Sequence, residues 1–321
     1  MKRHAVLIPT YNSVRTLAET LQSVLVQDLS AVDGVYLADD ASSDGTVELA
    51  RRIWQSDTPL VVIQHERNGG ERRNVNVALR QLPKHLEWIH ILHSDDLAKP
   101  HWLATIIRQA DSGSSTVASI CSSWDNLNGD GSIEPGEDDT SKATVHVDGS
   151  AEAIRSTLRK GCWWHISGCA IRLEALRDIG GFAEDLPQTG DWEWLLRCLR
   201  SGWAVDYIPQ TLIVYRQHGA SVSSTSFRDH RDVSESLDVI KSYASYLTTL
   251  DVCRLHAARS WVLIRRTGKS LLQGNPARAR KAVVLLGGIP TRVGASLTSK
   301  HVTNGAPAKR HPERTRREES R

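Results

Sequence analysis

Short apolar runs alternate with helix-like segments through the first hundred residues, and this alternation constrains the fold more than any other feature. The runs with the length of buried strands lie at 5–9, 35–39, 60–64 and 88–92. Apolar residues at helical spacing follow the first run, at Leu17, Leu21, Val24 and Leu25. Because strands that alternate with helices form parallel sheets covered on both faces, the sequence predicts an α/β fold.

Polar residues follow directly after three of these strands. They are Tyr11, the pair Asp39 and Asp40, and the pair Asp95 and Asp96. Ligands of parallel sheets bind at the carboxyl ends of the strands, so we expect a site there. Adjacent carboxylates repel each other unless a cation or a shared proton neutralises them. The second pair therefore predicts bound Mn²⁺ or Mg²⁺ and a phosphate-bearing substrate; the alternative for either pair is a solvated loop that caps a helix.

Composition excludes several classes of protein. With 40% hydrophobic and 24% charged residues, the 321-residue chain is neither collagen-like nor wholly disordered, and its length suits about two domains. Its apolar runs are less than half of the roughly 20 residues that a membrane-spanning helix needs. The five cysteines are scattered, which predicts free thiols rather than disulfides or a zinc site. These features predict a cytoplasmic protein.

Charge is distributed unevenly along the chain. Residues 252–321 hold 16 Lys and Arg against 3 Asp and Glu, which leaves 24 and 34 for residues 1–251. The net charges of these parts are therefore +13 and −10. A basic segment that also carries Trp261 and Ile264 predicts peripheral contact with an anionic membrane at its inner face. The alternatives are a helical cap packed on the acidic body and a solvated tail.

Seven motifs, in this order, resemble the family 2 glycosyltransferases, which have a GT-A fold. They are PTYN at 9–12, ADDASSDGT at 38–46, NGGERRN at 68–74, HSDD at 93–96, GGF at 180–182, GDWEWLLR at 190–197 and YRQHGASVS at 215–223. The resemblance implies inverting transfer of a sugar from a nucleotide-sugar of UDP, dTDP or GDP type. It implies a glycan or polyprenyl-linked acceptor, bacterial polysaccharide or glycolipid synthesis, and no nucleic-acid partner.

The resemblance also implies roles for single residues. Those expected to bind the nucleotide-sugar are Pro9, Tyr11, Asn12, Asp39, Asp40, Asn68, Arg73, Asn74, Asp95 and Arg216. Among these, Tyr11 would pack on the base and Asp40 would accept a hydrogen bond from it. Asp95 and Asp96 would form the DxD-type site that holds the metal on the diphosphate, and Asp191 would be the general base.

Two of these assignments also rest on the residues themselves. Inverting transfer needs a carboxylate that takes the acceptor proton. Asp191 begins a predicted helix, whose dipole favours the ionised form, and Gly190 permits close approach. The family often has Glu-Asp here, so Glu193 remains an alternative base. Arg216 and His218 predict a clamp on the phosphate side, in which the arginine pairs with phosphate and a neutral histidine binds the metal.

We therefore predict a GT-A type, Rossmann-like, mostly parallel sheet flanked by helices. The expected parts are a nucleotide-sugar-binding half at 1–105, an acceptor-binding half at 106–225, a helical extension at 226–293 and a basic disordered tail at 294–321. Two other functions are considered, a sugar-nucleotide nucleotidyltransferase and a non-catalytic membrane- or nucleic-acid-binding scaffold. The first would carry a Gly-rich N-terminal loop, unlike PTYN, and the strand-end carboxylates argue against the second. Residues 126–137 have the spacing of an EF-hand loop, but a hairpin turn explains them better.

Overall fold

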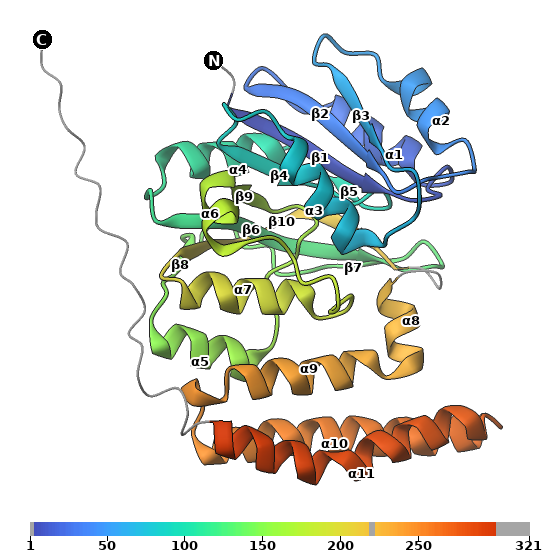
Figure 1. Cartoon of the computed structure of the whole chain (residues 1–321). Coiled ribbons are helices and arrows are strands. Elements are labelled where there is room, and N and C mark those ends of the chain that lie inside the picture. The colour runs from blue at the N-terminus through green and yellow to red at the C-terminus, as the bar shows by residue number, and fades with distance from the viewer. Residues whose placement is uncertain (1–2, 218–221, 300–321) are drawn as a thin grey trace, which may run out of the picture.

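The computed structural model describes residues 3–217 and 222–299. Within them, ten strands form one mixed sheet whose main path runs β3-β2-β1-β4-β9-β6-β10-β5, with β7 beside β6 and β8 beside β10 (Figure 1). The strands are β1 (His4–Thr10), β2 (Val32–Asp39), β3 (Leu60–Gln64), β4 (Trp88–Ile91), β5 (Leu97–Ala98), β6 (Val117–Leu127), β7 (Ile133–Glu134), β8 (Val145–Val147), β9 (Ala170–Arg172) and β10 (Ala204–Arg216).

Helices connect and cover these strands. They are α1 (Leu17–Leu25), α2 (Thr46–Ile53), α3 (Glu71–Gln81), α4 (Trp102–Ser112), α5 (Ala151–Lys160), α6 (Leu173–Ile179), α7 (Gly190–Arg200), α8 (Val222–Asp229), α9 (Arg231–Ser242), the 3₁₀ turn η1 (Ala244–Tyr246), α10 (Thr249–Leu272) and α11 (Pro276–Ser299). Over the described ranges, none of them is both long and apolar enough to cross a membrane.

The first four strands pair in parallel, as the sequence predicts, whereas the second half of the sheet is mixed. β1 lies between β2 and β4, with Leu7 opposite Tyr36 on one side and Ile91 on the other. β9 then enters between β4 and β6 and runs antiparallel to both. A strand of three residues is too short to show a period-two pattern. The sequence therefore gave no signal for this reversal.

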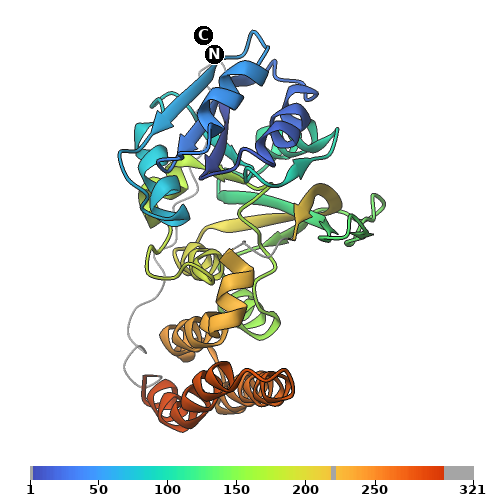
Figure 2. The same ribbon diagram turned by 90° about the vertical axis from the view of Figure 1, so that its right-hand side faces the viewer.

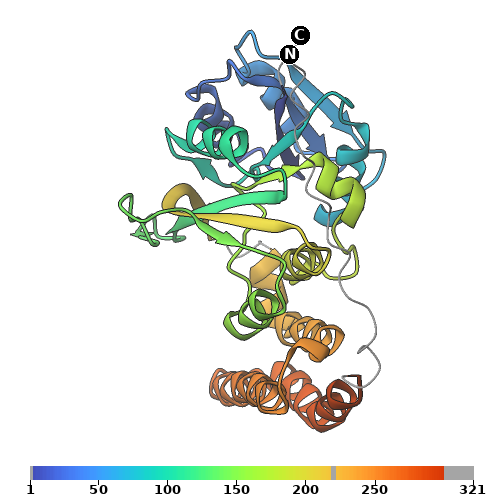
Figure 3. The ribbon, with the colours of Figure 1, turned by 90° about the vertical axis from the view of Figure 1, so that its left-hand side faces the viewer.

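Two hydrophobic cores cover the two faces of the sheet. In β1, Ala5 and Leu7 face one core, whereas Val6 and Ile8 face the other. This division follows from the alternation of side chains along a strand, and both faces are apolar because helices cover both. The turned views show the helices on either side of the sheet (Figures 2 and 3).

The C-terminal helices form a separate layer beneath the sheet and its helices (Figure 1). They are attached through the first core, to which α9 and α10 contribute Val239, Ile240, Val252 and Leu255. Helix α8 runs across the predicted boundary at 225/226, and α11 continues through 294–299, where the sequence analysis expected a disordered tail. Residues 300–321 lie outside the described residues. The 126–137 segment contains a turn followed by the short β6–β7 pairing, as the hairpin interpretation predicts.

A buried histidine pair on the neighbouring strands β1 and β4 predicts loss of stability in acid. His4 Nδ1 lies 3.0 Å from Nε2 of His90, and both rings are almost fully buried. Burial lowers the pKa of His90 well below its usual value, and the pKa of His4 is also lowered, mainly by burial. Below about pH 6.5, the unfolded chain therefore binds protons that these histidines do not bind in the folded chain.

The contribution of this histidine pair to stability should therefore be complete above pH 6.5 and be lost as the pH is lowered, by up to about 1.4 kcal/mol per pH unit for each histidine. Denaturant unfolding at pH 7.5 and 5.5 measures this loss. The His90→Leu variant should show a shallower pH dependence, and a dependence equal to that of the wild type would contradict the assignment.

Candidate active site

A cleft of about 1150 Å³ runs from the carboxyl ends of β1, β2 and β4 to the helical extension. The predicted site residues that line it are Pro9, Tyr11, Asn12, Asp40, Asn68, Asn74, Asp95, Asp191 and Arg216. Asp39 and Asp96 are fully buried, and Arg73 lines a smaller adjoining pocket of about 290 Å³. His218 lies outside the described residues. The structure thus brings motifs that are far apart in the sequence to one cavity.

At the end of β2, the two acidic residues are held by the backbone around them. The carboxylate of Asp40 accepts hydrogen bonds of 2.8 to 3.1 Å from the amides of Gly69 and Gly70. Asp39 accepts from the amide of Ser42 and the side chain of Gln64, both at 3.1 Å. These contacts order the loops around the nucleotide end of the cleft. Whether Asp40 also accepts a hydrogen bond from a base stays a prediction.

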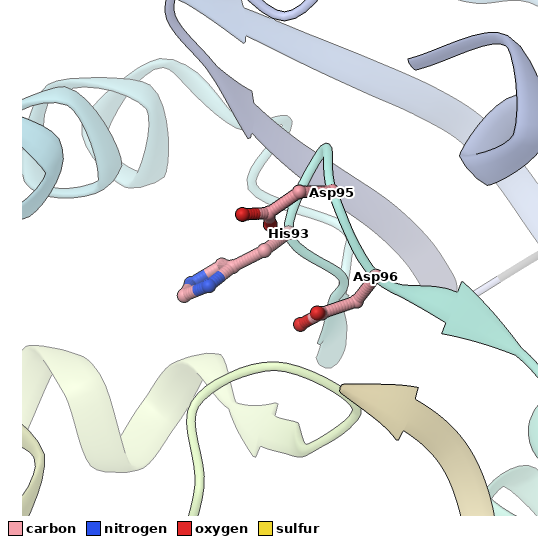
Figure 4. Close-up of side chains that lie close together, drawn as sticks. All are labelled: His93, Asp95 and Asp96. Atoms are coloured by element: carbon pink, nitrogen blue, oxygen red, sulfur yellow. The ribbon is translucent and has the colours of Figure 1, made fainter. Parts of the chain in front are cut away.

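Three side chains from the turn after β4 lie close together (Figure 4), and two of them, His93 and Asp95, line the cleft. One ligand atom from each of His93, Asp95 and Asp96 lies within 4.8 Å of the others, a spacing that suits a metal ion. Asp96 Oδ1 accepts a 2.9 Å hydrogen bond from the amide of Arg216, whereas its buried Oδ2 has no hydrogen-bond partner among the described residues. Burial, and then the charge of Asp95, raise the pKa of Asp96 to about 6. A divalent cation would neutralise this cluster, so the residues fit a metal.

A chain of partly buried charged side chains joins this cluster to Asp191. His93 Nε2 lies 3.3 Å from Glu71 Oε1, Glu71 lies 3.4 Å from Arg72, and Arg72 pairs with Asp191. Burial opposes the charge on His93, but Glu71 and the two aspartates outweigh it and raise the pKa of that ring. Burial also opposes the charge of Arg72, but Asp191 and Glu71 raise the pKa of its guanidinium above the ordinary value. The carboxylate of Asp191 is therefore held beside a fixed positive charge.

The structure gives a reason for glycine at position 190 that the sequence did not show. A Cβ at this position would meet Nε of Arg72 at 3.1 Å, which is closer than most packed atoms tolerate. The glycine therefore leaves room for the guanidinium that pairs with Asp191. Glu193, the alternative base, instead forms a 2.8 Å ion pair with Arg197 one turn further along α7. Of the two acids, Asp191 is the one that lines the cleft.

Arg216, at the end of β10, contacts the turn that follows β4. Its Nε donates to the carbonyl of Asp95 at 2.8 Å, and its Nη2 pairs with Glu19 at 2.6 Å. Together with the amide that contacts Asp96, these bonds fix the position of the loop. The phosphate-clamp role of this arginine stays a prediction, as does that of His218.

Several cleft residues were not singled out from the sequence. They are Glu71, Arg72, Trp124 and Tyr215 in the body, and Asp232, Ser236 and Arg259 in the extension. Glu71 and Arg72 stand inside the NGGERRN motif, but the sequence analysis chose Arg73 instead. Helix α3 begins at Glu71 and buries Arg72, while Arg73 is only partly buried. The residues of the extension carry no sequence signal, because only the tertiary fold brings α9 and α10 to the cleft.

Comparisons with known proteins add to this geometry. The profile of Glycosyl transferase family 2 matches residues 5–141, and that of Glycosyl transferase family group 2 matches residues 88–233. Succinoglycan biosynthesis protein ExoO of Rhizobium meliloti is 30% identical over 112 residues, which cover 35% of this chain and 31% of that protein. The match thus spans only about a third of that relative's length.

Solved structures share the whole architecture. Staphylococcus aureus TarS 1–349 in complex with UDP-GlcNAc has a TM-score of 0.58 at 19% identity, over 93% of this chain and 90% of that one. Mannosyltransferase PcManGT from Pyrobaculum calidifontis, in complex with GDP-Man and Mn²⁺, has a TM-score of 0.57 at 18% identity, over 93% and 87%. These likenesses confirm the predicted α/β fold of GT-A type.

Proposed function

The chain belongs to the family 2 glycosyltransferases, and on this premise we propose that it moves a sugar from a nucleotide-diphosphate sugar to an acceptor hydroxyl with inversion. One observation carries the proposal. A metal-suited cluster of His93, Asp95 and Asp96 and an acid suited to be a base, Asp191, line or underlie the same cleft and are joined by partly buried ion pairs. Bacterial polysaccharide or glycolipid synthesis is the setting that we propose, in line with the printed role of the relative ExoO.

In the reaction, each end of the cleft has a different task. The nucleotide end, with Tyr11 and Asn68 at its surface, would bind the donor, and Asp95 and Asp96 would hold a divalent cation. Such a cation, when bound, supplies positive charge to the departing diphosphate. Asp191 would accept the proton of the acceptor hydroxyl as that oxygen attacks the anomeric carbon. Arg72 keeps the carboxylate of Asp191 oriented throughout.

The donor and the metal that we propose are of the kinds found in structurally similar proteins. The TarS structure contains UDP-GlcNAc, and the PcManGT structure contains GDP-Man and Mn²⁺. We propose a nucleotide-sugar of UDP, dTDP or GDP type, with Mn²⁺ or Mg²⁺. The direct test is thermal stabilisation by UDP, dTDP and GDP, each with and without Mn²⁺. We expect one of them to stabilise the chain in a metal-dependent manner, and no stabilisation by any of them would overturn the proposal. Production of a nucleoside diphosphate, rather than pyrophosphate, during turnover would separate transfer from nucleotidyl transfer.

A second observation favours peripheral contact with an anionic membrane. Leu250, Trp261 and Leu272 of α10 recur every 11 residues, or about three helical turns, and are 56%, 61% and 92% exposed. Arg254 and Arg265 have the same spacing and are also exposed. These five residues, which we call the outer stripe of α10, lie on the face directed away from the buried Val252 and Leu263. A helix with apolar and basic residues on one free face suits the headgroup region of a bilayer.

This contact should depend on both charge and salt. Each Lys or Arg near an anionic surface contributes about 1 kcal/mol, so Arg254→Gln with Arg265→Gln should weaken binding more than tenfold. Cosedimentation with phosphatidylglycerol vesicles at low salt measures it, and neutral vesicles serve as the control. The neighbouring Arg266 is not substituted in this variant, because its guanidinium pairs with Asp232 through two 2.8 Å hydrogen bonds. Equal partitioning onto both kinds of vesicle, or onto neither, would contradict membrane contact.

A further inference from the structure

The helical extension forms one end of the cleft and contributes a positively charged side chain to it. Asp232 and Ser236 of α9 and Arg259 of α10 line the same cavity as Asp191. Figure 1 shows α9 directly beneath α7, the helix that Asp191 begins, with α10 in the layer below. The extension is therefore part of the wall of the cleft on the side opposite the nucleotide end.

This wall is fixed to the segment that precedes the proposed base. Glu235 of α9 accepts hydrogen bonds of 2.9 Å from the amides of Gln188 and Thr189, and one of 3.2 Å from the Thr189 hydroxyl. Glu235 as a whole residue is 7% exposed, so these bonds are shielded from water. Because Asp191 follows two residues after Thr189, these bonds fix the position of α9 relative to Asp191.

Arg259 carries a positive charge that its surroundings do not balance. Its Nε donates a long, 3.4 Å hydrogen bond to Ser236 Oγ, which itself donates to the carbonyl of Val233 at 2.8 Å. No carboxylate within the described ranges forms an ion pair with Arg259, and the nearby Asp232 is engaged on both oxygens by Arg266. Burial lowers the pKa of the Arg259 guanidinium, an effect that the charge of Asp232 only partly opposes.

A partly buried guanidinium without a carboxylate partner is costly to the folded protein alone. The cost is recovered when an anionic ligand supplies the missing partner, because an arginine binds a phosphate or carboxylate through two parallel hydrogen bonds. Two other arginines of the cleft are already engaged, since Arg72 pairs with Asp191 and Arg216 pairs with Glu19. Arg15 also lines the cleft, but it is exposed and lies at the nucleotide end, close to Tyr11 and Asn12 in the sequence.

We propose that Arg259, positioned by Ser236, forms an acceptor subsite that recognises an oxyanion, so that the acceptor of this enzyme carries a phosphate or carboxylate group near the hydroxyl that is glycosylated. This inference rests on the proposed function and specifies its substrate class. The donor diphosphate would occupy the strand-end side of the cleft, and the acceptor anion would bind at the extension, with Asp191 between the two.

The test uses the full chain with its nucleotide end filled by the nucleoside diphosphate and Mn²⁺ found to bind in the stabilisation assay. Glucose 6-phosphate, glucuronate and glucose are then titrated by ligand-observed NMR. At least one of the anionic sugars should bind about tenfold or more tightly than glucose. The phosphate and carboxylate arms identify which anion the subsite accepts.

Three variants test the residue. Arg259→Gln should reduce the affinity for the anionic sugar to that for glucose, and Arg259→Lys should retain an intermediate affinity because it keeps the charge without the fork. Arg280→Gln, an exposed arginine of α11, is the matched control and should leave the affinity unchanged. Arg259→Gln should unfold at the same temperature as the wild type or higher, because it removes an unbalanced charge.

Equal binding of all three sugars, or unchanged binding of the anionic sugar to Arg259→Gln, would overturn the subsite. A chain that binds no nucleoside diphosphate would instead overturn the proposed function. The two failures are therefore separable, since the first leaves the donor assay positive.

Discussion

Sugar transfer should fall by about 10³-fold when Asp191 is replaced by asparagine, while the affinity for the nucleoside diphosphate stays the same. A general base contributes about 10² to 10⁴ to the rate of proton transfer, and an amide cannot take up the acceptor proton. The substitution preserves the size of the side chain and an oxygen that can accept from Arg72, so the ion-pair partner is not left without a contact. Single-turnover transfer and nucleotide titration measure the two quantities separately.

Glu193→Gln is the matched control, because Glu193 lies two residues after Asp191 on the same helix. Because Glu193 pairs with Arg197 at 2.8 Å, its loss should cost a small amount of stability and leave transfer within a fewfold of the wild type. A large loss of transfer in Glu193→Gln, together with an active Asp191→Asn, would mean that the base is Glu193.

Much of the body could be predicted from the sequence because its signals are local. The apolar runs correspond to β1 to β4, and the strand ends hold Tyr11, Asp40 and Asp95 at the cleft. Helix α5 could also be located, since Ser150 accepts from the amide of Ala153 at its start and Gly161 follows its end with φ +89°. Such features depend on a few neighbouring residues, and tertiary contacts did not override them.

What could not be predicted depends on contacts across long sequence distances. Arg72 pairs with a residue more than a hundred positions away, and neighbouring arginines in a motif give no sign of which one is buried. The tie from Glu235 to Thr189 and the arrival of Arg259 at the cleft have the same origin. The charge asymmetry predicts that the C-terminal part binds anions, but it does not distinguish the outer stripe of α10 from Arg259, which lines the cleft.

Replacing Asp96 by asparagine should abolish most of the metal dependence of donor binding, with a loss of about 100-fold or more in the affinity measured with Mn²⁺. Substitution of residues that only support metal ligands already costs about 10- to 100-fold, and here the proposed ligand itself is changed. Asparagine keeps the Oδ1 acceptor for the Arg216 amide, so the turn after β4 should remain in place. Asp95→Asn should show the same loss, because its carboxylate belongs to the same cluster. Calorimetric titration of the nucleoside diphosphate with and without Mn²⁺ gives both affinities.

The stability of the metal-free protein separates this loss from misfolding, because it should change in the opposite direction. The pKa of Asp96 is raised to about 6, above its value of 3.8 in a model peptide, so its ionised form is disfavoured in the folded chain. For an acid with a raised pKa, the penalty is complete above pH 6 and vanishes below about pH 3.8. At pH 7.5 without metal, Asp96→Asn should therefore unfold at a higher temperature than the wild type, and added Mn²⁺ should stabilise only the wild type. A variant that is less stable without metal and still gains from Mn²⁺ would show that Asp96 has a purely structural role, and the metal would then have to be held without its carboxylate.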